Sequence, residues 1–134
     1  MSDLSNRQSA ASRQGRRFEE IVEGLLLIDG WTINARNWRH PEIEVEVDIV
    51  ATNPEGVEWW IECKGSWESP SRNGLERTDT LKKAIGSAAL IRLLPDRRPY
   101  MVITSHLPVS GAALKWYELA LNTYVDKFRV VGLS

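Results

Sequence analysis

This sequence has a single cysteine, a net charge close to zero and no long apolar run. Cys63 is the single cysteine among 134 residues, which excludes an internal disulfide framework and a zinc site built from several cysteines. No apolar stretch approaches the roughly 18 residues that a membrane-spanning helix requires. The net charge of −1 argues against a constitutively basic coat for nucleic acid. The polar N-terminus lacks the apolar core of a signal peptide, so we expect a cytoplasmic protein that binds no membrane.

The length and the patterning indicate one folded domain. A chain of 134 residues fits a domain of ordinary size and leaves little room for a second one. Residues 1–12 are polar and contain several Ser, Asn and Gln residues, which predicts an N-terminal arm. Residues 13–134 are expected to form the domain.

Apolar periodicity and turn residues predict an alternation of helices and strands. The expected helices span residues 15–28, 78–94 and 111–124, and the expected strands span residues 31–38, 43–52, 57–64, 99–105 and 128–133. The turn sequence NPEG, residues 53–56, should join its two flanking strands as an antiparallel hairpin. Helices between the later strands favour parallel pairing there. The predicted fold class is α/β, a central mixed β-sheet with an αβββαβ core flanked by helices, plus a C-terminal helix and strand.

The stretch VEWWIECKGS, residues 57–66, places an acid and a base on one face of a strand. Side chains alternate between the two faces, so Glu62 and Lys64 share a side with Trp60. Cys63 points to the other side, where we expect it to be a small core residue rather than a nucleophile.

Asp48 provides a second acid in the preceding strand. Within IEVEVDIVAT, Asp48 is expected on the same face as Glu46 and on the opposite face from Val47 and Ile49. It lies five residues before the NPEG turn, and Glu62 lies six residues after it. The hairpin should therefore bring the two carboxylates within a few ångströms of each other.

Two facing carboxylates beside a lysine are typical of metal-assisted phosphate chemistry. Mg²⁺ is usually held by one or two carboxylates, with water and phosphate oxygens in its other positions. The ammonium of Lys64 could orient a water molecule or stabilise a developing oxyanion. The simpler interpretation is an ion pair between Glu62 and Lys64 beside a solvated acidic strand.

This arrangement resembles the signature of the PD-(D/E)XK nucleases, which restriction endonucleases and Holliday-junction resolvases carry on a β-hairpin. The matching residues are Asp48, thirteen residues, then Glu62-Cys63-Lys64. The segment GRRFEEIVEGLLLIDGW is similar to the helix of Mrr-like and resolvase-like members, whose glutamate reaches the metal site. The resemblance implies an endodeoxyribonuclease that depends on Mg²⁺, with Mn²⁺ as a substitute. It also implies that Asp48, Glu62, Glu19 and the Cys63 carbonyl bind the metal, while Lys64 acts on the attacking water.

Two ligand assignments have close competitors in the sequence. At about 100° per residue, Glu19 lies at the edge of the apolar helix stripe around Phe18, whereas Glu20 faces solvent. Helix geometry and the family pattern both favour Glu19. The proline that often precedes the aspartate in the family is absent, so Glu46 competes with Asp48. We favour Asp48 because a buried Ile-Val-Ala run follows it, as in the family.

Basic and aromatic residues near these motifs are candidates for DNA contacts. Around an acidic centre they would form a rim that follows the phosphates, and an aromatic ring could stack on bases. The candidates are Arg16, Arg17, Arg36, Arg39, Trp67 and Arg72. His106 has no partner at a metal-ligand spacing, so we expect it to have a surface or structural role.

The expected partner is DNA, with RNA left open, and no small-molecule cofactor is expected. A chain of this size leaves no room for a separate target-recognition domain, so we expect structure-selective cleavage or cleavage with low sequence specificity. A homodimer is expected, because one site cuts one strand at a time. The alternative function is a non-catalytic nucleic-acid-binding or assembly subunit that retains the nuclease fold. The presence of Glu19, Asp48, Glu62 and Lys64 together argues against that alternative.

Overall fold

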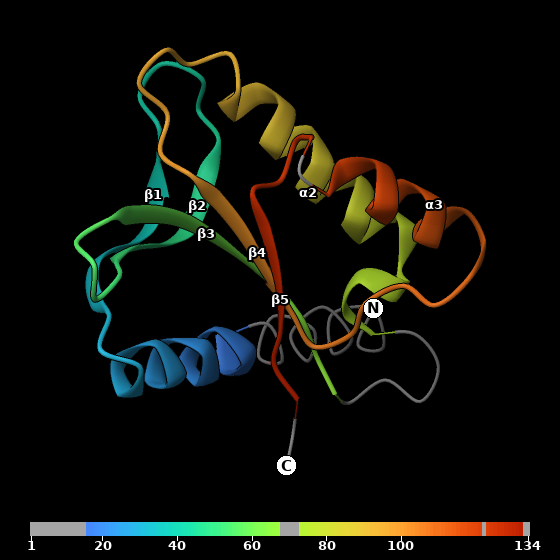
Figure 1. The fold of residues 1–134 in the computed structure, drawn as a ribbon, viewed down its shortest axis with the longest axis horizontal. Coiled ribbons are helices and arrows are strands. Elements are labelled where there is room, and N and C mark those ends of the chain that lie inside the picture. The colour runs from blue at the N-terminus through green and yellow to red at the C-terminus, as the bar shows by residue number, and fades with distance from the viewer. Residues whose placement is uncertain (1–15, 68–72, 122, 133–134) are drawn as a thin grey trace, which may run out of the picture.

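The computed structural model describes residues 16–67, 73–121 and 123–132, and it confirms the α/β fold (Figure 1). Residues 16–28 form an N-terminal helix. The other elements follow in the predicted order: β1 (Thr32–Arg39), β2 (Glu46–Thr52), β3 (Glu58–Lys64), the short 3₁₀ helix η1 (Gly74–Glu76), α2 (Thr78–Ile91), β4 (Tyr100–Thr104), α3 (Gly111–Ala120) and β5 (Lys127–Val130). The arm predicted for residues 1–12 lies outside the described residues. In the described ranges, no helix has both the length and the apolar character needed to cross a membrane.

The strands form one five-stranded mixed sheet, in which their order in space is their order in the chain. β2 is antiparallel to both β1 and β3, so the predicted hairpin across residues 53–56 is confirmed. α2 lies between β3 and β4, and α3 lies between β4 and β5, so these strands run parallel, as expected. The carboxyl ends of β3 and β4 therefore lie at the same end of the sheet as the amino end of β2.

Helices cover both faces of the sheet and create two apolar cores. On one face, Leu81 of α2 packs in the same core as Trp60 of β3. On the other face, Phe18 and Leu26 of the N-terminal helix pack in the same core as Ile61. Figure 1 shows the N-terminal helix in blue on the opposite side of the sheet from α2 and α3.

The strand predicted over residues 43–52 is shorter than expected and begins at Glu46. Glu44 has a φ of 55°, in the left-handed region, which is incompatible with an extended strand. The Glu44 amide donates to the His40 carbonyl, and the His40 amide donates to the Val45 carbonyl. These hydrogen bonds form a tight turn, so β1 and β2 are also a hairpin.

The later elements also end earlier than their periodicity predicts. The helix expected over 78–94 ends at Ile91, after which backbone hydrogen bonds span three residues, as in a turn. The helix expected over 111–124 ends at Ala120, because Leu121 adopts an extended backbone. Helix ends are the least determined part of such a pattern, because terminal carbonyls need partners outside the helix.

Gly65, directly after β3, is in close contact with the N-terminal helix. A Cβ atom at this position would lie 2.6 Å from the Phe18 ring, closer than real Cβ atoms approach. We expect Gly65→Ala to lower the free energy of unfolding by roughly 1–3 kcal/mol, the usual effect of overpacking.

Gly24→Ala is the matched control for Gly65→Ala. Gly24 lies exposed in the N-terminal helix, and a Cβ atom added there would have nothing within 4 Å, so the added methyl group should raise stability by roughly 0.5–1 kcal/mol. Urea denaturation measures both variants. A Gly65→Ala protein as stable as Gly24→Ala would contradict the close packing against Phe18.

Candidate active site

β2 and β3 separate at the end of the sheet that carries the predicted acids. The last paired residues of the two strands are Ile49 and Ile61. Beyond this pair, the Cys63 amide donates a 2.8 Å hydrogen bond to Asp48 Oδ2 instead of continuing the backbone ladder. The amide and carbonyl of one residue in such a strand point to the same side, so the Cys63 carbonyl also faces the Asp48 side.

The carboxyl groups of Asp48 and Glu62 meet where the strands separate. Their side chains are hydrogen-bonded to each other. Glu62 is only 6% exposed, and its Oε2 atom accepts a 3.3 Å hydrogen bond from the Tyr100 hydroxyl. The hairpin register thus brings the two acids together from neighbouring strands.

Lys64 lies beside one of these acids, Glu62. Its Nζ atom lies 3.9 Å from Glu62 Oε1, and its side chain is 26% exposed. The ammonium is therefore within ion-pair distance of a buried carboxylate and still accessible to solvent. Such a position suits a group that orients water beside the acids.

The alternation of side chains along β2 is interrupted at Asp48. Val47 packs in the core under α2, whereas Ile49 packs in the core under the N-terminal helix. The prediction that both residues lie on one face is therefore wrong. Asp48 and Asn37 are missing from the regular pairing of β1 with β2, and Asn37 has a left-handed φ of 49°. Val47 and Ile49, two residues apart, point to opposite faces on either side of Asp48.

Glu19 joins these acids from the N-terminal helix. Burial, followed by the negative charge of Asp48, raises the pKa of Glu19 to about 7, while Lys64 acts in the opposite direction. The neighbouring Glu20 is exposed. Of the two glutamates, Glu19 is the one whose pKa responds to Asp48. Because the charge of Asp48 acts on both Glu19 and Glu62, we call Glu19, Asp48 and Glu62 the acidic cluster.

The pKa of Glu62 is raised further than that of Glu19. Burial, followed by the hydrogen bond and the charge of Asp48, raises the pKa of Glu62 to about 9. Lys64 and Tyr100 lower this pKa without cancelling the rise. Burial also raises the pKa of the Cys63 thiol well above its usual range, which fits a protonated core residue. Burial and the charge of Asp48 thus both disfavour the ionised forms of Glu62 and Glu19.

The chemistry of these oxygen atoms fits Mg²⁺. This ion needs only one or two carboxylates and keeps several water ligands. Asp48 and Glu62 provide the carboxylates, and the Cys63 carbonyl faces the same side. Across the part of the chain that the structure describes, no three His, Cys, Asp or Glu side chains are grouped so that they could hold a metal ion. Glu19 is therefore better suited to act through a water molecule than as a direct third ligand.

Two of the predicted DNA-contacting arginines already have acidic partners. Arg36 of β1 forms an ion pair with Glu23 of the N-terminal helix. Arg39 lies 3.7 Å from Glu46, which is exposed. Glu46 thus faces an arginine, whereas Asp48 contacts β3, and this geometry favours Asp48 as the ligand.

The other predicted contact residues differ in how much of each side chain is accessible. Arg16 and Arg17 are exposed in the N-terminal helix, three and two residues before Glu19. Trp67 is half-buried, with its ring centroid 5.1 Å from that of Phe18, so packing accounts for much of its surface. Arg72 lies outside the described residues.

The structure also shows polar residues that the sequence interpretation missed. Tyr100, which contacts Glu62, occurs in an apolar stretch, and only the parallel pairing of β4 with β3 brings it to the site. Ser105 Oγ accepts from the Ser66 amide and donates to the Ser66 carbonyl. This Oγ atom also lies 2.8 Å from His106 Nδ1, within hydrogen-bond distance. This bond fits the structural role predicted for His106.

Comparison with known proteins gives no family assignment. No protein-family model and no curated protein matches this sequence. Among solved structures, the chain is similar to the crystal structure of a repair endonuclease from Pyrococcus abyssi, with a TM-score of 0.48 and 11% identity. The match covers 81% of this chain and 42% of that chain, so this chain spans less than half of that protein's length.

Proposed function

We propose that this protein is a Mg²⁺-dependent endonuclease that hydrolyses DNA phosphodiester bonds. The observation that carries the proposal is the hydrogen-bonded pair of Asp48 and Glu62, with Lys64 3.9 Å from Glu62. Their order and spacing resemble the PD-(D/E)XK signature. A solvated ion pair would leave unexplained why Glu62 is buried beside a second acid, an arrangement that costs free energy without a cation.

Each residue of the site has its own role in the proposed reaction. A divalent cation, when bound, lowers the pKa of its water and offsets the charge that develops on the phosphate. Asp48 and Glu62 supply the negative charge that holds it, and the Cys63 carbonyl adds a neutral oxygen. Lys64 orients the attacking water and stabilises the phosphate oxygens as negative charge builds up. Glu19 accepts a hydrogen bond from water on the helix side of the site.

The substrate proposal is DNA, cleaved with structure selectivity or with low sequence specificity, and Mn²⁺ is expected to replace Mg²⁺. Arg16 and Arg17 are exposed beside Glu19 in sequence and suit contacts to phosphates. One such site cuts one strand at a time. Cleavage of both strands, or of a junction, would therefore require two copies of the chain.

Cleavage of supercoiled plasmid and of a synthetic four-way junction tests this function. Wild-type protein is expected to cut with Mg²⁺ or Mn²⁺ and to stop when EDTA is added. Lys64→Ala should cut about a hundredfold more slowly, the size of effect seen when one electrostatic group is removed from an active site. The matched control is Lys127→Ala, because Lys127 is exposed on the edge strand β5, which β4 separates from β3. Its rate should equal that of wild type.

Three outcomes would count against the proposal. Cleavage that continues in EDTA would exclude a metal-dependent reaction. An unchanged rate in Lys64→Ala would exclude the role given to this lysine. DNA binding that requires Mg²⁺ but produces no cleavage would instead support a non-catalytic nucleic-acid-binding or assembly subunit.

A further inference from the structure

One buried tyrosine connects the acidic cluster to the core under α2. Tyr100 is the first residue of β4 and is 1% exposed. In the parallel pairing of β3 with β4, Tyr100 lies opposite Trp60, and Val102 lies opposite Glu62. Tyr100 and Glu62 are therefore diagonal neighbours on one face of the sheet, within reach of a long side chain. The Tyr100 hydroxyl donates its 3.3 Å hydrogen bond to Glu62 across this diagonal.

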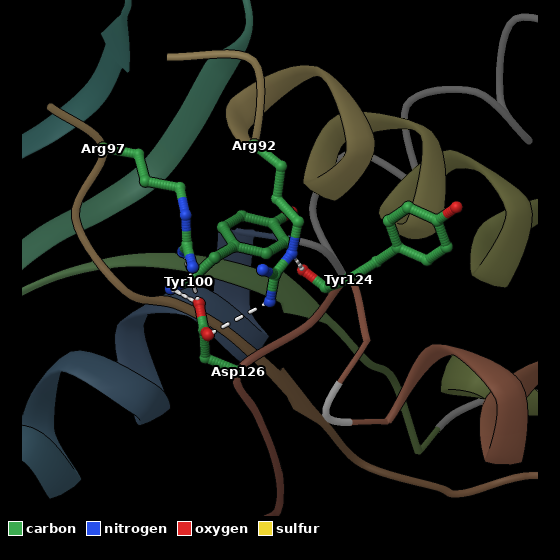
Figure 2. Close-up of polar contacts among 5 residues, drawn as sticks. All are labelled: Arg92, Arg97, Tyr100, Tyr124 and Asp126. Carbon is green, nitrogen blue, oxygen red and sulfur yellow. Dashed lines mark hydrogen bonds and ion pairs between the residues drawn. The ribbon is translucent and has the colours of Figure 1, made fainter. Parts of the chain in front are cut away.

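Tyr100 is held firmly at its backbone. Its amide donates a 2.8 Å hydrogen bond to Asp126 Oδ2. Asp126 also accepts hydrogen bonds from Arg97 at 2.9 Å and from Arg92 at 3.2 Å, so two guanidinium groups fix this carboxylate (Figure 2). The Tyr100 amide, followed by Arg97 and Arg92, lowers the pKa of Asp126 despite its partial burial, which fits an ionised anchor. Charge-assisted hydrogen bonds of this kind are about twice as strong as neutral ones.

Tyr100 is also held at its hydroxyl. Ser87 of α2 forms a hydrogen bond to this hydroxyl, and the hydroxyl in turn bonds to Glu62 Oε2. The ring between these two ends is fully enclosed by the core. A donor fixed in this way can specify the direction of the carboxylate that it contacts.

The two oxygens of Glu62 consequently have different surroundings. Oε2 is occupied by Tyr100, whereas Oε1 lies 3.9 Å from Lys64 Nζ. A carboxylate with one oxygen tied down loses less rotational freedom when its other oxygen binds a ligand. Such supporting hydrogen bonds typically change metal affinity or activity by about 10–100-fold.

We propose that Tyr100 is a positioning residue for Glu62. Its hydroxyl donates to Oε2 and leaves Oε1 to bind the cation. Asp126 fixes the backbone of Tyr100, and Ser87 interacts with its hydroxyl. This inference rests on the proposed function, because it concerns the cation that Glu62 is proposed to hold.

The Mn²⁺ dissociation constant of the full-length protein, measured by isothermal titration calorimetry, tests this role. Tyr100→Phe removes only the hydroxyl and is expected to weaken Mn²⁺ binding by about 10–100-fold. Tyr117→Phe is the matched control, because Tyr117 of α3 packs on Phe128 of β5 with ring centroids 4.8 Å apart, and β4 separates β5 from the strand that carries Glu62. Its affinity should stay within about twofold of wild type.

A double variant separates positioning from a general loss of structure. If Tyr100 acts through Glu62, adding Tyr100→Phe to Glu62→Gln should cost no further Mn²⁺ affinity, because coupled residues are not additive. A purely structural role would lower the melting temperature and leave the Mn²⁺ dissociation constant unchanged, which would overturn the inference. If Tyr100→Phe does not fold, Ser87→Ala takes its place, with an expected loss of about three- to tenfold. An unchanged affinity in that variant would also overturn the inference.

The same titrations distinguish this inference from the proposed function. Wild-type protein that binds Mn²⁺, and binds it more weakly in Glu62→Gln, supports the proposed site whatever Tyr100→Phe does. Wild-type protein that binds no Mn²⁺ would overturn both proposals.

Discussion

Asp48→Asn is expected to reduce the rate of Mg²⁺-dependent DNA cleavage by about a thousandfold, while the protein stays folded. The amide side chain keeps an oxygen that can accept the Cys63 amide hydrogen bond where β2 and β3 separate. It removes the negative charge that Asp48 contributes to the proposed cation site. That charge also raises the pKa of Glu62 and Glu19, so its loss relieves repulsion in the metal-free protein. We therefore expect the metal-free variant to melt at a higher temperature than wild type at alkaline pH.

Glu46→Gln is the matched control for Asp48→Asn. Glu46 is an exposed carboxylate two residues earlier in β2, and it faces Arg39 instead of β3. Its substitution should change the cleavage rate by less than about threefold. Initial rates on plasmid, together with melting curves in EDTA, measure both variants. If Glu46→Gln is inactive and Asp48→Asn is active, the ligand assignment is wrong.

The stability of the metal-free protein is expected to fall as the pH rises, and Mg²⁺ should reverse this loss. Folding raises the pKa of Glu62 from 4.5 to about 9 and that of Glu19 from 4.5 to about 7. The folded state therefore binds more protons than the unfolded state between these values, so stability decreases from about pH 4.5 up to about pH 9. Mg²⁺ competes with these protons, so its stabilising effect should grow over the same range.

Melting temperatures with and without Mg²⁺, at matched ionic strength, measure this linkage. A ligand at about 100 times its dissociation constant stabilises the folded state by about 2.7 kcal/mol. For a domain of this size, that corresponds to a rise of roughly 5–10 °C. Glu62→Gln should show a smaller dependence on pH and a smaller response to Mg²⁺ than wild type. A Mg²⁺ response that is equal at acidic and alkaline pH would show that these carboxyl groups do not bind the ion.

The hairpin that carries the candidate site could be predicted from local sequence. The NPEG turn fixes the register of β2 and β3, and the register fixes which acids face each other. The pair Ile49 and Ile61 is the last regular one, and Asp48 and Glu62 follow it directly, as the sequence predicts. Helix amphipathicity similarly predicts which glutamate lies nearer the core: Glu19 is half-buried and Glu20 is exposed, because the helix buries the stripe around Phe18.

The parts that could not be predicted depend on contacts between distant segments. Tyr100 reaches Glu62 only because α2 brings the chain back so that β4 runs beside β3. The sequence of a short apolar strand contains no pattern that fixes the register of such a parallel pair. Asp126 lies 26 residues after the Tyr100 amide that it binds, so this contact is not local either. The split of Val47 and Ile49 between two cores breaks the strict alternation along β2, which is the pattern that the sequence predicts.

The two outer strands of the sheet limit how copies of this chain could associate. β5 has only four residues, with Lys127 and Arg129 along it, and β1 is distorted at Asn37. Short, charged or irregular edge strands pair poorly with a strand of a second chain. Natural proteins resist fibril formation in the same way. Any pairing of two copies for double-strand cleavage is therefore expected to use helix surfaces or loops instead of a continuous intermolecular sheet.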